Sequence, residues 1–221
     1  LSAAGLPATI NALLTTTALL LVIGGMLSRV APVFTPSLLA SSDKLTVLVF
    51  ALVIGVLAGF FEEIGWSGFA TPRMLKQHGV LTTGLILGAL WGTWHLLADY
   101  WGNAGAFGAL YPIRGLLWVV TLTAYRILMV WVYSKTSSLG LMQLMHAGFT
   151  GGQALWEPPL PPVDYLLWYG LFAAALWLLV ILLIRFQCKR EAHSPSFEEP
   201  EKAQTILRAD MLAGVTHLAD K

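Results

Sequence analysis

Apolar residues along this chain gather in long runs rather than in short alternating patterns. A helix needs about 20 mostly apolar residues to cross the hydrocarbon core of a bilayer, and about six windows reach that length. The windows are residues 8–27, 45–65, 80–98, 115–133, 137–156 and 165–184. The pattern predicts an all-α, polytopic helical membrane protein, with about six transmembrane helices around a central polar cavity.

The segments between the windows contain residues that favour turns. Proline cannot continue a helix, and glycine tolerates the backbone of a turn. The expected breaks are Pro32 and Pro36, the region of Gly79, the stretch from Gly102 to Pro112, and the proline-rich residues 157–163.

After Ile184 the sequence becomes charged and contains proline and serine. We therefore expect a transmembrane domain over residues 1–184 and a polar, flexible tail over 185–221, with a short helix at 203–212. The chain starts at Leu1 without a methionine, so upstream helices can be missing. No basic segment precedes 8–27, and we interpret that window as a membrane helix rather than a signal peptide.

Composition agrees with this interpretation. Hydrophobic residues make up 57% of the chain and charged residues 11%, against about 25% charged residues in soluble domains. The net charge of +1 gives no overall bias toward nucleic acid or an acidic partner, and we expect no nucleic-acid partner. The single cysteine, Cys188, cannot form an intrachain disulfide and suits a reducing face of the membrane.

Lysine and arginine in short loops orient a membrane protein, because they favour the cytoplasmic side. With the tail inside, one set of basic residues is cytoplasmic and a smaller set is external. The first set is Arg73, Lys76, Lys135, Arg185, Lys189 and Arg190, and the second is Arg29, Lys44 and Arg114. We expect a multi-pass protein of the bacterial cell membrane with a cytoplasmic C-terminus.

Several ionisable residues fall inside the apolar windows, where a charge costs at least ~2.5–3.5 kcal/mol. They are Glu62, Glu63, His95, Arg126 and His146.

The two glutamates are adjacent, so their side chains point about 100° apart on a helix and should have separate partners. Glu62 shares a face with Trp66 and Phe69, and Glu63 shares a face with Ser67.

Two later windows carry polar residues at helical spacing. Trp91, His95 and Asp99 lie on one face, at i, i+4 and i+8, so Asp99 is a candidate neighbour of His95. His146 and Thr150 are also four residues apart, among small residues that let another chain approach.

Together these residues supply one acid, two histidines and a hydroxyl on three helices. A carboxylate in apolar surroundings can take a proton from water, a histidine can share that water, and the other donors can hold an oxyanion. Spacing alone does not separate such a hydrolase from a metal site.

Three short motifs, in order, resemble the CPBP (CAAX protease and bacteriocin-processing) intramembrane proteases. That family is marked by EExxxR, FxxxH and HxxxN or HxxxD on successive membrane helices. This chain has Glu62-Glu63-Ile-Gly-Trp-Ser67, Trp91-Gly-Thr-Trp-His95 and His146-Ala-Gly-Phe-Thr150. The surrounding EEIGWxGFATPRM, ALWGxWHL and KTSSLxxxxLMHAGF are also similar, and the resemblance covers about residues 48–152.

The resemblance implies an intramembrane glutamic endopeptidase, similar to the CAAX prenyl proteases, that cleaves a peptide or a membrane-tethered protein. It implies that Glu62 is the general base, that His95 shares its water, and that His146 and Thr150 hold the oxyanion. Glu63 and Arg126 would support the site. No cofactor is implied.

The chain departs from the family pattern at two polar positions. Ser67 stands where the arginine of EExxxR is usual, so Glu63 lacks its expected ion pair, which Arg126 or Arg73 would have to replace unless Glu63 is protonated. Thr150 stands where asparagine or aspartate is usual, and offers one donor in place of two.

Other interpretations remain open. The glutamates could snorkel toward headgroups, the histidines could be interfacial or structural, and the whole chain could be a non-catalytic scaffold or a bacteriocin-immunity protein. A proton-relay transporter and a zinc site are further alternatives, although HExxH is absent. Simple spans also place Glu62 and His95 at different depths, unless the second helix continues through Phe69.

Overall fold

The computed structural model describes residues 5–192 and the side chains of residues 16–188. Its contacts divide the chain into two units, Leu1–Ile181 and Leu182–Lys221. In the second unit the described residues 182–192 are helical. The expected tail beyond them, with its short helix at 203–212, lies outside the described residues.

Between residues 5 and 192 the chain forms helices and short connections, without strands. The elements are α1 (Gly5–Val30), η1 (Pro32–Phe34), α2 (Ser37–Ala40), α3 (Lys44–Gly65), η2 (Trp66–Ala70), α4 (Thr71–Met74), α5 (Val80–Phe107), η3 (Gly108–Leu110), α6 (Tyr111–Thr136), α7 (Leu139–Trp156) and α8 (Pro162–Ala192).

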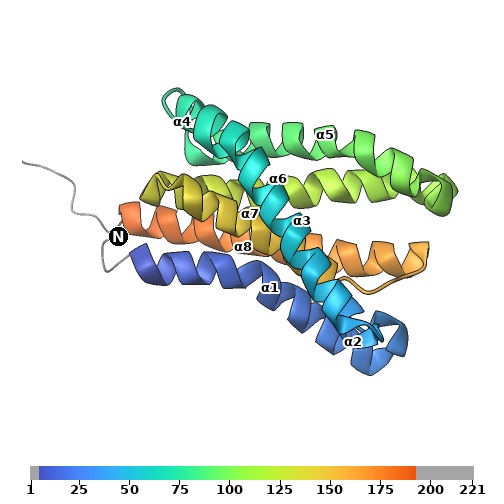
Figure 1. Ribbon diagram of the computed structural model, residues 1–221. Helices are drawn as coiled ribbons and strands as arrows, with labels where there is room; N and C mark the ends of the chain where they lie inside the picture. The colour runs from blue at the N-terminus through green and yellow to red at the C-terminus, as the bar shows by residue number, and fades with distance from the viewer. Residues whose placement is uncertain (1–4, 193–221) are drawn as a thin grey trace, which may run out of the picture. The chain divides into compact units, whose positions relative to one another are not determined.

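Each of the six apolar windows corresponds to one helix, although the fifth window, 137–156, starts two residues before α7 begins at Leu139. The six helices alternate in direction along the chain (Figure 1). By length and hydropathy, three stretches of the described chain are able to cross a membrane: Lys44–Met74, Val80–Thr136 and Pro162–Cys188. The second of these contains both α5 and α6. The predicted all-α, polytopic membrane fold is confirmed.

Local chemistry explains where the helices begin and end. The Asp43 carboxylate accepts the Thr46 amide at 3.1 Å and so caps α3, and the Ser138 hydroxyl caps α7 in the same way. Gly108 ends α5 with a φ of 50°, a conformation that glycine adopts without a steric penalty. Ser137 ends α6 with a φ of 49°.

Glycine allows two close helix pairs. α5 packs along α6, where a Cβ on Gly88 would lie 2.5 Å from the Thr123 Cα. α3 packs along α7, where a Cβ on Gly59 would lie 2.8 Å from the Ala147 amide nitrogen. Larger residues would separate these backbones, so the small side chains fix how the polar residues of each pair face one another.

The second apolar helix is longer than its window. α3 continues through the π-helical turn η2 and through α4, so that one stretch runs from Lys44 to Met74. α5 likewise continues past residue 98 to Phe107. The extension places Glu62 and His95 in the interiors of two antiparallel helices, which removes the difference in depth that the short windows implied.

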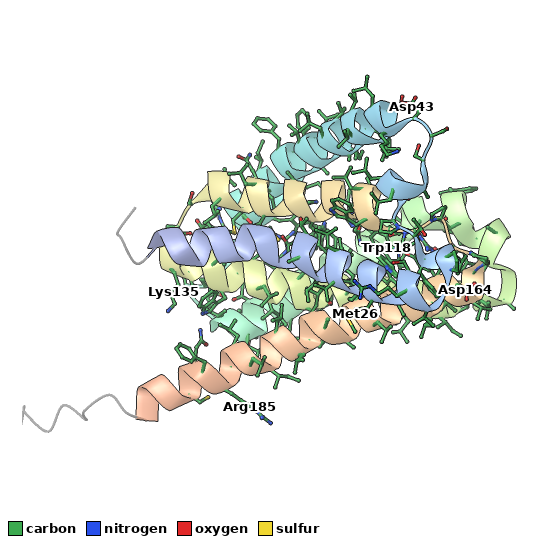
Figure 2. All side chains as sticks on the ribbon, turned by 90° about the horizontal axis from the view of Figure 1, so that it is seen from below. Met26, Asp43, Trp118, Lys135, Asp164 and Arg185 are labelled. Atoms are coloured by element: carbon green, nitrogen blue, oxygen red, sulfur yellow. The ribbon has the colours of Figure 1, made fainter. Side chains whose placement is uncertain are left out.

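The part of α8 within the first unit supplies an aromatic face to the core. Trp168, Tyr169 and Phe172 are fully buried there. The Trp118 indole on α6 donates to the Tyr165 hydroxyl at 3.2 Å, and Figure 2 shows Trp118 among the packed side chains of the helices. Aromatic packing therefore joins α8 to the helix that carries Arg126.

Candidate active site

Glu62 lies on α3 and faces two residues of α5. The Trp91 indole nitrogen donates to Glu62 Oε2 at 2.8 Å, and His95 Nε2 lies 3.8 Å from Glu62 Oε1. The side chains of Glu62 and His95 are 20% and 22% exposed. This carboxylate and imidazole are thus partly accessible, and each keeps an atom free to meet a small molecule.

The other nitrogen of His95 fixes the tautomer of the ring. His95 Nδ1 lies 2.9 Å from the Trp91 carbonyl oxygen, which can only accept a hydrogen bond. Nδ1 therefore carries the proton, and in the neutral ring Nε2 presents a lone pair toward Glu62. Glu62 Oε1 and His95 Nε2 are then two acceptors that can bind the same small donor, such as a water molecule.

Glu63 points away from Glu62 into a fully buried cluster. Arg126 donates from Nη1 to Glu63 Oε2 at 2.8 Å and from Nη2 to Oε1 at 2.9 Å. The Ser67 hydroxyl also donates to Oε2, and His146 Nδ1 lies 2.8 Å from Oε1. The side chains of Glu63 and Arg126 are both 0% exposed. A paired charge of this kind satisfies the buried carboxylate and ties α3 to α6 and α7.

The two adjacent carboxylates therefore bind different groups. Arg126, rather than Arg73, supplies the guanidinium for Glu63. The exposed Arg73 donates to the Phe69 carbonyl oxygen instead and lies over the Phe69 ring.

His146 joins the buried cluster through Nδ1, which must donate because the Glu63 carboxylate accepts. Its ring stands edge-on to the Trp91 indole, with 4.9 Å between the ring centroids. Thr150 lies one helical turn further along α7. Among the residues with described side chains, no hydrogen bond joins its hydroxyl to another group.

Asp99 does not partner His95. Its carboxylate binds Arg114, with 2.7 Å between Oδ1 and Nη2, and accepts the Asn103 amide at 2.8 Å. Instead, the His95 ring stacks on Trp118, with 6.0 Å between the centroids. Sequence reasoning missed Trp118, whose apolar window gives no sign of which ring it meets.

Trp91 lies at the centre of the site and is 1% exposed. It contacts Glu62 directly and the partner of Glu63. Its N–H binds Glu62, and the guanidinium of Arg126, which pairs with Glu63, lies over its ring, 4.3 Å from the centroid. The sequence placed Trp91 on one helix face with His95 but gave no sign of its contact with Glu62 or Arg126. Its spacing of four before His95 was the available signal that the two share a face.

A mostly apolar cavity of about 530 Å³ lies beside the helix that carries His146. It is lined by residues of α1, α3 and α7, among them Leu48, Val56, Leu144 and Gly148. No group of three or more His, Cys, Asp or Glu side chains in the described part of the chain is arranged to hold a metal ion.

Comparison with known families agrees with the motifs. Residues 44–151 match the family model described as Type II CAAX prenyl endopeptidase Rce1-like. This match confirms the resemblance that the three motifs suggested. Among curated proteins, none matches the chain. The matched segment begins with α3 and ends within α7, so it contains Glu62, Trp91, His95, Arg126, His146 and Thr150.

Proposed function

We propose that this chain, whose residues 44–151 belong to the Rce1-like CAAX prenyl endopeptidase family, hydrolyses a peptide bond of a membrane-tethered substrate with water activated by Glu62 and His95. The observation that carries the proposal is the pairing of Glu62 Oε1 with His95 Nε2 at 3.8 Å, both partly exposed. The family match supports a CAAX protease-like function in general. The roles of the individual residues are those that the resemblance implies, and the contacts of Glu62 with His95 and Trp91 support them.

A water molecule can donate one hydrogen to Glu62 Oε1 and the other to His95 Nε2. Its oxygen lone pairs then face outward, toward a substrate carbonyl carbon. Glu62 takes a proton as the water oxygen bonds to that carbon, and the proton later passes to the amine that leaves when the C–N bond breaks. The products are a carboxylate and an amine, and the carboxylate of Glu62 is restored.

The oxygen of the attacked carbonyl becomes negative and needs donors. His146 Nε2 and the Thr150 hydroxyl are the proposed donors, one helical turn apart on α7. Because His146 Nδ1 already donates to Glu63, Nε2 can donate only when the ring carries both protons. Glu63 is then a positioning residue, since it holds the ring through Nδ1.

The apolar cavity beside α7 supports a substrate with a lipid-like part. It adjoins the turn of α7 that carries His146, and it could hold a hydrocarbon chain while the attached peptide reaches Glu62. Each buried CH₂ group contributes about 0.8 kcal/mol to the free energy of binding, so the affinity for a prenyl or acyl chain should increase with the length of the chain.

The test uses the purified chain in liposomes with a fluorogenic C-terminal peptide, lipidated and non-lipidated. We expect cleavage of the lipidated peptide, and loss of at least about 100-fold in Glu62→Gln and in His95→Ala. Asp164→Asn changes a carboxylate on α8 outside the site and is the matched control. Cleavage by Glu62→Gln at the wild-type rate would refute the proposal.

A further inference from the structure

Trp91 stands out among the residues around the proposed water site, because it contacts both halves of that site. Its indole N–H binds Glu62 Oε2 at 2.8 Å, and its backbone carbonyl oxygen accepts from His95 Nδ1 at 2.9 Å. The backbone contact is available to any residue at position 91. The contact with Glu62 requires a donor on the side chain, which the indole supplies and phenylalanine lacks.

We propose that Trp91 is a positioning residue that holds Glu62 in its working orientation through the indole N–H, an inference that rests on the proposed peptidase function. With Oε2 held, the other oxygen, Oε1, is left facing His95 Nε2. Loss of the N–H frees the carboxylate to rotate, and the water then loses one of its two acceptors for part of the time.

The surroundings of the indole strengthen this contact. Trp91 is 1% exposed, so bulk water does not compete for its N–H. The Arg126 guanidinium lies over its ring, 4.3 Å from the centroid, and a cation there draws electron density from the indole and makes the N–H a better donor. The His146 ring stands edge-on to the indole and limits its rotation.

The packing of α5 against α6 fixes the position of the Trp91 indole along this helix pair. Gly88 and Gly92 lie against the α6 backbone at Thr123 and Val119. Because these contacts keep α5 from sliding along α6, the indole keeps its place against the Arg126 guanidinium of α6. Trp91 therefore connects the partly exposed Glu62, through its N–H, to the buried Arg126 that pairs with Glu63, although no bond joins the two carboxylates.

A spectroscopic test examines the hydrogen bond without any need for turnover. The chain has nine tryptophans, and the Trp91 signal in the indole ¹H–¹⁵N spectrum is the one absent from Trp91→Phe. Glu62→Gln should move this signal and leave that of the exposed Trp101 in place. A Trp91 signal that stays fixed in folded Glu62→Gln would show that the contact is absent, and would overturn the proposal.

A kinetic test then measures how much the Trp91–Glu62 hydrogen bond contributes to the rate of cleavage. A hydrogen bond to a charged group corresponds to about a tenfold to hundredfold effect on rate. Trp91→Phe, which keeps an aromatic ring, should lower kcat by that factor and leave KM within about twofold. Trp101→Phe, on an exposed part of the same helix, should match wild type. Equal kcat in Trp91→Phe and wild type would overturn the positioning role.

A double variant separates positioning from packing. Glu62→Asp draws the carboxylate back by one methylene and breaks its contact with the indole, so adding Trp91→Phe should cost less than about threefold more. The same loss in both backgrounds would mean that Trp91 acts through packing, which overturns the proposal. If the wild type cleaves no lipidated peptide while the Trp91 signal still responds to Glu62→Gln, the peptidase function fails, and the kinetic role of Trp91 fails with it.

Discussion

Arg126→Met should destabilise the protein more than removal of an exposed arginine does. Arg126 donates two hydrogen bonds to Glu63, and both side chains are 0% exposed. Without the guanidinium the carboxylate stays buried with only Ser67 and His146 as partners. Removing one partner of a buried pair costs about 3–5 kcal/mol. For a domain of this size, that corresponds to a Tm lower by about 6–20 °C.

The assay is thermal unfolding of purified protein in detergent, with Arg73→Met as the matched control. Arg73 is exposed and binds only the Phe69 carbonyl oxygen and ring, so its loss should cost about 1 kcal/mol or less. Adding Glu63→Gln to Arg126→Met removes the unpaired charge and should restore most of the Tm. A single variant within about 2 °C of wild type would refute the argument, and so would a double variant no more stable than the single one.

Substitutions at four further positions, each with its comparison variant or measurement, test other parts of the structure. Gly59→Ala should lower Tm and activity together, because its Cβ would press on the α7 backbone, whereas Gly65→Ala, with nothing within 4 Å, should do neither. Ser67→Arg combined with Arg126→Met should recover part of the lost Tm, because position 67 already contacts the Glu63 carboxylate; no recovery in thermal unfolding would show that the guanidinium must come from α6. Thr150→Asn should raise kcat because an amide offers two donors, and Thr150→Val should lower it by about tenfold or more; equal kcat in both would remove Thr150 from the site. Burial raises the pKa of the Glu157 carboxyl from 4.5 to about 7, although part of its surface is accessible. The folded state then holds this proton more tightly than the unfolded state, so the free energy of unfolding should fall as pH rises from about 4.5 to about 7. Glu157→Gln should flatten that slope in thermal unfolding measured across this range.

The sequence predicted the helices well because a membrane span depends on a local property, the length of an apolar run. The same apolar pattern located the ends of the helices less well. The window that ended at residue 65 missed η2 and α4, since Ser67, Thr71 and Arg73 lower the hydropathy without breaking the helix. The hydroxyls of Ser67 and Thr71 bind the Glu63 carboxylate and the Trp66 carbonyl, so they belong to a helix interior.

The partners of the site residues were harder to predict, because they depend on how the helices are aligned. Adjacent positions on a helix already required Glu62 and Glu63 to face different groups. Whether Arg126 or Arg73 met Glu63 depended on the contacts of α6, which are set by glycines such as Gly88. The spacing of Gly84, Gly88 and Gly92, four residues apart on one face of α5, was a usable signal for that contact. The spacing made Asp99 a candidate partner of His95, whereas the Asp99 carboxylate binds Arg114 of α6, a contact that spacing along one helix does not reveal.

The Arg126–Glu63 pair changes how the departures from the family pattern should be weighed. A motif written along one helix treats Ser67 as the loss of an arginine. In space the carboxylate keeps a bidentate guanidinium, now from α6, and also gains the Ser67 hydroxyl. Ser67 therefore gives no reason to expect an inactive protein. Thr150 differs, because no described side chain replaces the missing amide donor beside His146. The choice between a peptidase and a non-catalytic scaffold thus depends on Thr150 rather than on Ser67, and the Thr150→Asn and Thr150→Val pair is the comparison that addresses it.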